Sequence, residues 1–141
     1  MIRFWGTVLC VAVGVAMLAG GAAIAGSPAN QTATQFYVAY RAAFEKATKI
    51  DDVVPYMCAE ARKQIGSTPA ADRDKMFGMI KMLDTHTKIK VLREDRQPDG
   101  SVMLGVSAYD TDQKKDVTGT VAIVKEDGAW KLQKESWTSG S

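Results

Sequence analysis

Apolar residues recur at helical spacing between Thr32 and Lys49. At 100° per residue, small and aromatic side chains fall within one arc of about 100°, and the charged side chains fall outside it. The residues inside the arc are Ala33, Phe36, Tyr37, Tyr40, Phe44 and Ala47, and those outside it are Arg41, Glu45, Lys46 and Lys49. The pattern predicts an amphipathic helix with an aromatic face.

Two further start signals predict helices before residue 85. The pair Asp51-Asp52 can cap a helix that Gly66 ends, so residues 52–64 are expected to form one short helix or two broken ones. Thr68-Pro69 is the next start signal and predicts a helix that runs to about Asp84. The apolar residues of this helix recur at helical spacing: Met76, Phe77, Ile80 and Leu83.

Beyond residue 85 the period of the apolar residues changes to 2, which is the period of strands. Four such segments begin near Thr87, Val102, Val117 and Trp130, separated by turn signals that include Glu126-Asp127-Gly128. The positions predicted to face the core are Val102, Leu104, Val106, Val117, Val121, Ile123 and Leu132. Glu135 shares the parity of Lys131 and Gln133, so it is expected to point outward.

Helices followed by a meander of strands predict an α+β domain, with N-terminal helices packed on one face of a four-stranded antiparallel sheet. This order, the aromatic first helix and the closing hairpin at residues 126–132 resemble the nuclear transport factor 2-like superfamily, the cystatin-like cone. The resemblance covers about residues 32–137 and is nearest to small exported bacterial domains of undefined role. It implies a curved, cone-shaped sheet around the first helix, with a pocket between them. The candidate pocket-lining residues are Phe36, Tyr37, Tyr40, Phe44 and Trp130.

The N-terminus has the pattern of a secretory signal peptide. Arg3 precedes an uncharged run, residues 7–18, and Ala23 and Ala25 have the spacing that signal peptidase requires. Cleavage after Ala25 predicts four segments: signal peptide 1–25, flexible leader 26–31, domain 32–138 and tail 139–141. The predicted location is periplasmic or secreted, with no membrane contact after cleavage. An uncleaved anchor is the alternative, because about 20 apolar residues span a bilayer.

Composition excludes several classes of function. The chain has 18 basic and 16 acidic residues, a formal net charge of +2, and this balance argues against nucleic-acid binding through phosphate contacts. Residues 26–141 contain no P-loop, no dinucleotide-binding glycine pattern and no cysteine pair for zinc, so no cofactor is expected. Cys58 is the one cysteine after cleavage, and it is expected to be a buried apolar side chain.

Enzymes of the superfamily use an Asp or His base with a Tyr or acid as oxyanion donor. Carried over to this sequence, Tyr37 and Tyr40 are the candidate donors. The predicted core-facing strand positions are all apolar, however, and carboxylates such as Asp110 and Asp112 are expected in a solvated loop, so no catalytic residue is predicted. An isomerase or dehydratase that uses a Tyr in the cone stays an alternative.

Three methionines, Met76, Met79 and Met82, precede the single histidine, His86. Thioethers with an imidazole select Cu(I), so these four residues are candidate ligands if the helix continues to His86. The preferred interpretation is that the methionines fill gaps in the core and that no metal is bound. Periplasmic Cu(I) binding is thus a second alternative.

The outward face of the middle strands is predicted to be small and uncharged: Met103, Gly105, Ser107, Thr118, Thr120 and Ala122. A solvated face normally carries more charge, so this patch favours a homodimer through the outer sheet face. The predicted function is an exported, non-catalytic binding or accessory domain that holds a small apolar ligand or a protein partner.

Overall fold

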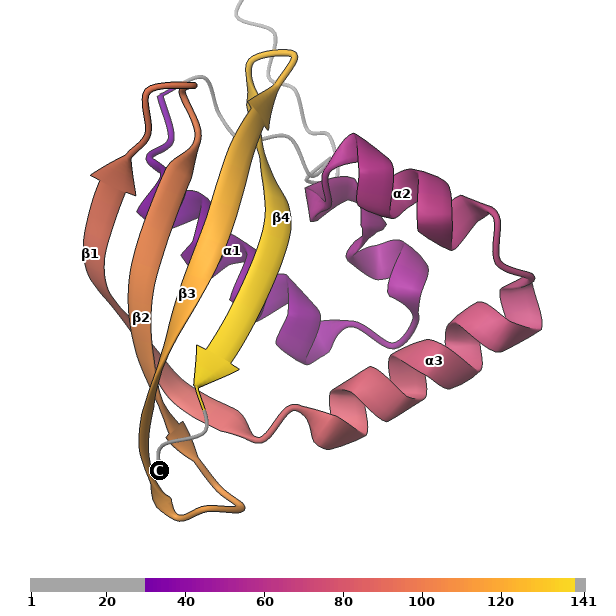
Figure 1. The fold of residues 1–141 in the computed structure, drawn as a ribbon. Helices are drawn as coiled ribbons and strands as arrows, with labels where there is room; N and C mark the ends of the chain where they lie inside the picture. The colour runs from indigo at the N-terminus through magenta and orange to yellow at the C-terminus, as the bar shows by residue number, and fades with distance from the viewer. Residues whose placement is uncertain (1–29, 139–141) are drawn as a thin grey trace, which may run out of the picture.

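The computed structural model describes residues 30–138, and the predicted signal peptide and tail lie outside them. Helices and 3₁₀ turns come first: α1 (Ala33–Lys46), η1 (Ile50–Asp52), η2 (Val54–Tyr56), α2 (Ala59–Gly66) and α3 (Ala70–Leu83). The strands follow: β1 (His86–Arg96), β2 (Val102–Asp110), β3 (Lys115–Glu126) and β4 (Ala129–Thr138). They form one antiparallel sheet in the order β1-β2-β3-β4, with α1 behind it (Figure 1). The α+β prediction is confirmed, and the sheet is not closed into a barrel.

Helix α1 begins with a reciprocal cap. The Thr32 hydroxyl accepts the Gln35 backbone N–H at 3.1 Å, and the Gln35 side chain accepts the Thr32 N–H at 3.0 Å. All six residues of the predicted aromatic face are buried, which confirms that part of the prediction. Arg41 is buried too, with 7% of its surface exposed, although the helical wheel placed it outside this face.

The segment between α1 and α3 is broken rather than continuous. The Asp52 carboxylate accepts the backbone N–H groups of Thr48 and Lys49, at 3.0 and 3.2 Å, so it closes a turn behind itself instead of capping a helix ahead. Helix α2 begins only after Cys58, whose N–H donates to the Leu132 carbonyl oxygen at 2.8 Å. Cys58 is buried, as predicted.

The core face of the sheet follows the predicted alternation in β2 and β3. All seven predicted core positions are buried, and all but Val117 belong to the same core cluster as the aromatic face of α1. The β3–β4 turn has positive φ at Asp127 (51°) and Gly128 (78°), the geometry of a tight hairpin. This face of the sheet therefore presents an apolar layer to the aromatic side of α1.

Strand β4 changes parity halfway along. Leu132 pairs with Ile123, but Lys134 pairs with Ala122, so β4 has one extra residue, Gln133, at this point. Beyond this bulge, Glu135 lies opposite the core residue Val121. The prediction that Glu135 points outward is wrong, because a bulge turns the rest of the strand over.

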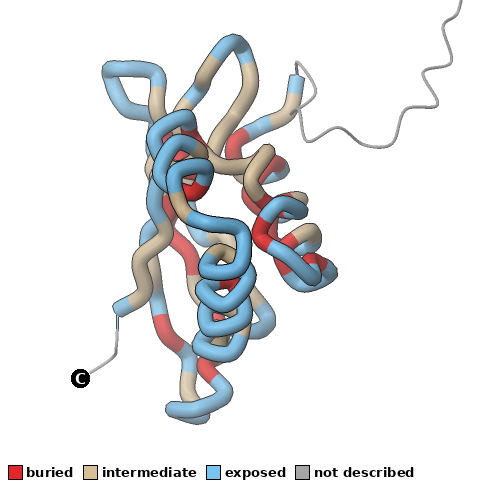
Figure 2. Tube along the Cα trace, turned by 90° about the vertical axis from the view of Figure 1, so that its right-hand side faces the viewer, coloured by how far each residue is buried: buried red, intermediate tan, exposed pale blue. Residues whose placement is uncertain are grey.

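Helix α3 extends away from the sheet and is mostly exposed (Figures 1 and 2). Phe77 is its buried residue and packs edge-on against Phe44, with ring centroids 5.9 Å apart. The exposed fractions of the methionines are 38% for Met76, 58% for Met79 and 75% for Met82, and Ile80 and Leu83 are exposed as well. The prediction that these methionines fill the core is wrong, because only one ring of α3 reaches it. No helix within residues 30–138 has the length and apolarity needed to cross a bilayer.

Candidate functional site

A pocket of about 330 Å³ opens between α1, the end of α3, the start of β1 and the end of β4. We call it the Arg41 pocket. Its wall combines aromatic and aliphatic side chains with one arginine, two carboxylates and a histidine: Tyr40, Arg41, Phe44, Ile80, Leu83, Asp84, His86, Glu135 and Trp137. The mixture is typical of sites that bind small molecules, which place a few polar groups in an apolar wall.

Arg41 connects two carboxylates from distant parts of the chain. Its Nη2 lies 2.7 Å from Asp84 Oδ2, just after α3, and its Nη1 lies 3.2 Å from Glu135 Oε1 on β4. Burial lowers the pKa of Arg41, but the two carboxylates outweigh that effect and raise it overall. Arg41 is therefore a permanent cation that holds α1, α3 and β4 together at the pocket.

The two oxygens of the Glu135 carboxylate have different surroundings. Its Oε1 accepts from Arg41 and also from the Trp137 indole N–H, at 2.8 Å. Its Oε2 is buried and has no hydrogen-bond partner within the described part of the chain. The donor nearest to this carboxylate besides Arg41 and Trp137 is the Tyr37 hydroxyl, whose pKa is raised in part by a hydrogen bond with Glu135.

Two tyrosine hydroxyls lie near this carboxylate. Burial, and then the charge of Glu135, raise the pKa of both Tyr37 and Tyr40 above the ordinary value for tyrosine. Both side chains are therefore neutral hydrogen-bond donors at physiological pH. The Tyr37 hydroxyl is buried, and its hydrogen bond with Glu135 is a further cause of its raised pKa, so this hydroxyl and the Glu135 carboxylate face each other.

His86 occupies the border between the Arg41 pocket and a neighbouring pocket of about 370 Å³. Its ring stacks on Trp137, with centroids 4.2 Å apart and planes 14° apart. Its Nδ1 is 3.1 Å from Asp84 Oδ1, and its Nε2 is 4.0 Å from Asp110 Oδ2. The imidazole is thus fixed between two carboxylates and one indole.

Asp110 is not the solvated loop carboxylate that the sequence predicts. It ends β2, only 4% of its surface is exposed, and its Oδ1 accepts the backbone N–H groups of Asp112 and Gln113, both at 2.9 Å. These hydrogen bonds, that from Gln113 first, lower the pKa of Asp110 against the opposing effect of desolvation. Asp110 therefore adds a fixed negative charge beside His86.

The five predicted pocket residues do not share one pocket. Tyr40 and Phe44 line the Arg41 pocket, whereas Phe36 is buried in the core. Tyr37 lines a different hollow of about 270 Å³, between α1 and β1. Trp130 lies next to the β3–β4 hairpin, where its indole N–H donates to the Gln31 carbonyl oxygen at 2.7 Å. Two of the residues that line the Arg41 pocket were therefore predictable from the sequence, and its charged residues were not.

The candidate copper ligands do not form the predicted arrangement. Helix α3 ends at Leu83, so His86 lies on β1 and does not extend the row of methionines. Its ring nitrogens face Asp84 and Asp110. Within residues 30–138, no group of three or more His, Cys, Asp or Glu is arranged to hold a metal ion.

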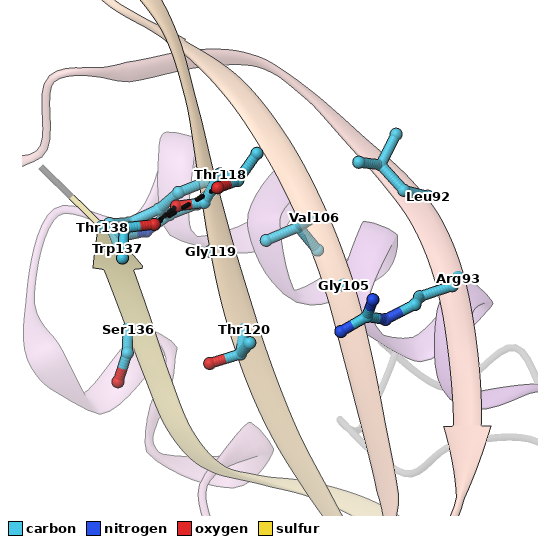
Figure 3. Close-up of a pocket in the computed structure, with 10 residues that line it drawn as sticks. All are labelled: Leu92, Arg93, Gly105, Val106, Thr118, Gly119, Thr120, Ser136, Trp137 and Thr138. Carbon is cyan, nitrogen blue, oxygen red and sulfur yellow. Dashed lines mark hydrogen bonds between the residues drawn. The ribbon is translucent and has the colours of Figure 1, made fainter. Parts of the chain in front are cut away.

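The outer face of the sheet has a shallow hollow of about 330 Å³, shown in Figure 3. Thr118 and Thr120 are exposed there, as predicted. Arg93 extends over Gly105, so that a Cβ at position 105 would lie 2.8 Å from Arg93 Cγ, and its Nε pairs with Asp95 Oδ2 at 3.0 Å. The face therefore carries an ion pair from β1 that the predicted patch did not include.

Comparisons with known proteins add little. No family model matches the chain, and no curated protein matches it. Among solved structures, the intermembrane space region of the chloroplast protein ARC6 aligns with 78% of this chain and 99% of that chain, at 12% identity and a TM-score of 0.35. At this score the two chains share too little structure for any property of that protein to be carried over.

Proposed function

We propose that this chain is an exported, non-catalytic binding domain that holds a small molecule in the Arg41 pocket. The observation that carries the proposal is the fixed ion-pair network of Arg41, Asp84 and Glu135 beside a wall of Tyr40, Phe44 and Trp137. Ligand pockets commonly combine an apolar wall with a few fixed polar groups, and both are present here.

The polar groups of the pocket are preorganised. Arg41, Asp84 and Glu135 come from three different elements and are fixed by two ion pairs, with the Trp137 indole as a further donor. Burying such a network costs desolvation free energy. Apolar side chains of similar size would stabilise the fold equally well. That such a network is present despite its desolvation cost therefore supports a function in recognition.

The resemblance to the nuclear transport factor 2-like superfamily belongs to this proposal. An aromatic α1 against a four-stranded antiparallel meander, with a pocket where helix and sheet separate, supports it. Export rests on the N-terminal sequence. N-terminal sequencing of the exported protein should find Gly26 first, and a chain that begins at Met1 in the membrane fraction would favour an anchor.

Tryptophan fluorescence provides the test of binding. A Trp130→Phe variant that begins at Gly26 keeps Trp137 as its one indole, and Trp137 lines the pocket. Titration with a panel of small neutral, cationic and anionic organic molecules should change this emission saturably for at least one of them. A Tyr109→Phe change, on an outer side chain away from the pocket, is the control and should not alter the titration.

A proton-transfer enzyme is the second candidate function, because the buried carboxylate that such an enzyme needs is present. Glu135 is the base that this hypothesis would use, and the neutral Tyr40 hydroxyl is its donor. Incorporation of solvent deuterium next to the carbonyl of a simple ketone, lost in Glu135→Gln, would support it. We prefer binding, because Oε1 already accepts from Arg41 and Trp137 and Oε2 is buried, so neither oxygen is placed to take a proton from a substrate.

A homodimer through the outer sheet face is also part of the proposal. Thr118 and Thr120 are exposed and compact, and the hollow beside them is broad enough to receive side chains of a second copy (Figure 3). The Arg93–Asp95 pair would lie within or beside such an interface.

A further inference from the structure

We infer that the ligand of the Arg41 pocket is an organic cation, a small ammonium compound with a compact apolar body. This inference rests on the proposed binding function and names the class of molecule that the site selects. Three features of the described residues carry it: the balance of charge, the free hydrogen-bonding capacity and the aromatic wall.

The charge balance of the pocket is negative. Among its lining residues, the single guanidinium of Arg41 faces the carboxylates of Asp84 and Glu135. The neighbouring pocket, which shares Leu83, His86 and Trp137, adds Asp110 and Asp112 and has no Lys or Arg among its described lining residues. Leaving His86 aside, the two pockets together carry one positive and four negative side chains. A cation is therefore attracted and an anion repelled.

Lys81 is a further cation near the pocket, and its ammonium group already donates hydrogen bonds to the backbone of α1. Lys81 Nζ donates to the carbonyl oxygens of Phe44 and Glu45, at 2.7 and 2.9 Å, at the C-terminal end of α1. This ammonium compensates the negative end of the helix dipole and does not line the pocket. Its charge, 5.0 Å from the Phe44 ring centroid, still offsets one carboxylate, so carboxylates outnumber cations by two across the two pockets.

The free hydrogen-bonding capacity also favours a donor. Glu135 Oε2 is a buried acceptor beside the Tyr37 hydroxyl, whereas both terminal nitrogens of Arg41 are already paired with carboxylates. Arg41 Nε is unpaired in the same part of the chain, but an anion that approached it would also meet Asp84 and Glu135. An ammonium N–H, or the positive methyl groups of a quaternary ammonium, matches the carboxylate instead.

The aromatic side chains of the wall suit a positive charge. Tyr40, Phe44 and Trp137 line the pocket, and ring faces attract cations electrostatically. Phe44 already holds two cations near its ring, with Arg41 Cζ 5.1 Å and Lys81 Nζ 5.0 Å from the centroid. Ile80 and Leu83 offer apolar contact to the remainder of the ligand.

The test compares three molecules of the same shape and different charge: choline, its neutral carbon analogue 3,3-dimethylbutan-1-ol, and the anion 3,3-dimethylbutanoate. Each is titrated into the chain from Gly26 to Ser141, and binding is followed by NMR at the Trp137 indole N–H. Choline should bind at least about tenfold more tightly than the alcohol, and the butanoate should bind most weakly.

Variants identify the carboxylate. Glu135→Gln should remove most of the preference for choline over the alcohol, whereas the matched change Glu60→Gln, on exposed α2, should leave it intact. If Glu135→Gln does not fold, the three-molecule comparison on the unmodified chain still decides. Equal binding of choline and alcohol, or tighter binding of the butanoate, would overturn the inference and leave the pocket a binding site. Absence of binding by all three at millimolar concentration would count against the proposed function itself.

Discussion

The Trp137 indole N–H donates to Glu135 Oε1 at 2.8 Å, two residues away on the same face of β4. Both side chains lie on the core side only because the bulge at Gln133 changes the parity of the strand. The same oxygen accepts from Arg41, so one irregularity in β4 joins the sheet to α1 and creates the polar part of the pocket.

Arg41→Met should destabilise the domain strongly. The substitution keeps an apolar stem but leaves Asp84 and Glu135 without their shared cation in a buried setting, which should cost about 3 kcal/mol in urea unfolding. Combining it with Asp84→Asn and Glu135→Gln should recover part of the loss, because the unpaired charges are then gone. A loss below about 1 kcal/mol for Arg41→Met alone would show that the ion pairs contribute little.

Phe44→Ala should cost about 3–5 kcal/mol in denaturant unfolding, since the ring is buried between Tyr40 and Phe77. Lys46→Ala, on the exposed side of the same helix, should change stability by less than about 0.5 kcal/mol. Similar effects for the two variants would mean that α1 does not pack on its aromatic face.

Met79→Ser should have almost no effect on stability, less than about 0.5 kcal/mol, because more than half of this side chain is exposed at 58%. Phe77→Ala, two residues earlier on the same helix, should cost about 3 kcal/mol because that ring is buried. Thermal unfolding of both variants distinguishes the exposed arrangement of α3 from the core packing that its apolar spacing suggests. A large loss for Met79→Ser would contradict the exposed arrangement.

The helices, strands and their order could be predicted from the sequence because periodicity reports which residues share a face. The charged residues of the pocket could not. Arg41 lies only about 40° beyond the aromatic arc on the helical wheel, and whether such a residue is buried depends on partners from elsewhere in the chain. Glu135 was assigned to the wrong face because a bulge leaves no period in the sequence. The exposure of α3 likewise depends on tertiary packing, because an apolar stripe along a helix does not reveal whether another element covers it.

Thr120→Lys should dissociate the proposed homodimer. Position 120 is exposed on the outer face, and a lysine there would bring like charges together across a twofold axis. Sedimentation at tens of micromolar should show a dimer for the unmodified chain and a monomer for the variant, while Gln64→Lys on α2 should remain dimeric. A monomeric unmodified chain would refute the interface, and a dimeric Thr120→Lys variant would place it elsewhere.

NMR chemical-shift mapping can show whether the Arg41 pocket receives a small molecule. Backbone and indole N–H signals of the uniformly ¹⁵N-labelled chain from Gly26 are followed during titration with choline. Saturable shifts are expected at Arg41, Phe44, Asp84 and the Trp137 indole, with Thr118 and Thr120 on the outer face unchanged. Shifts confined to the outer face, or no saturable shift at the pocket with choline or with either of its analogues, would contradict binding in this pocket.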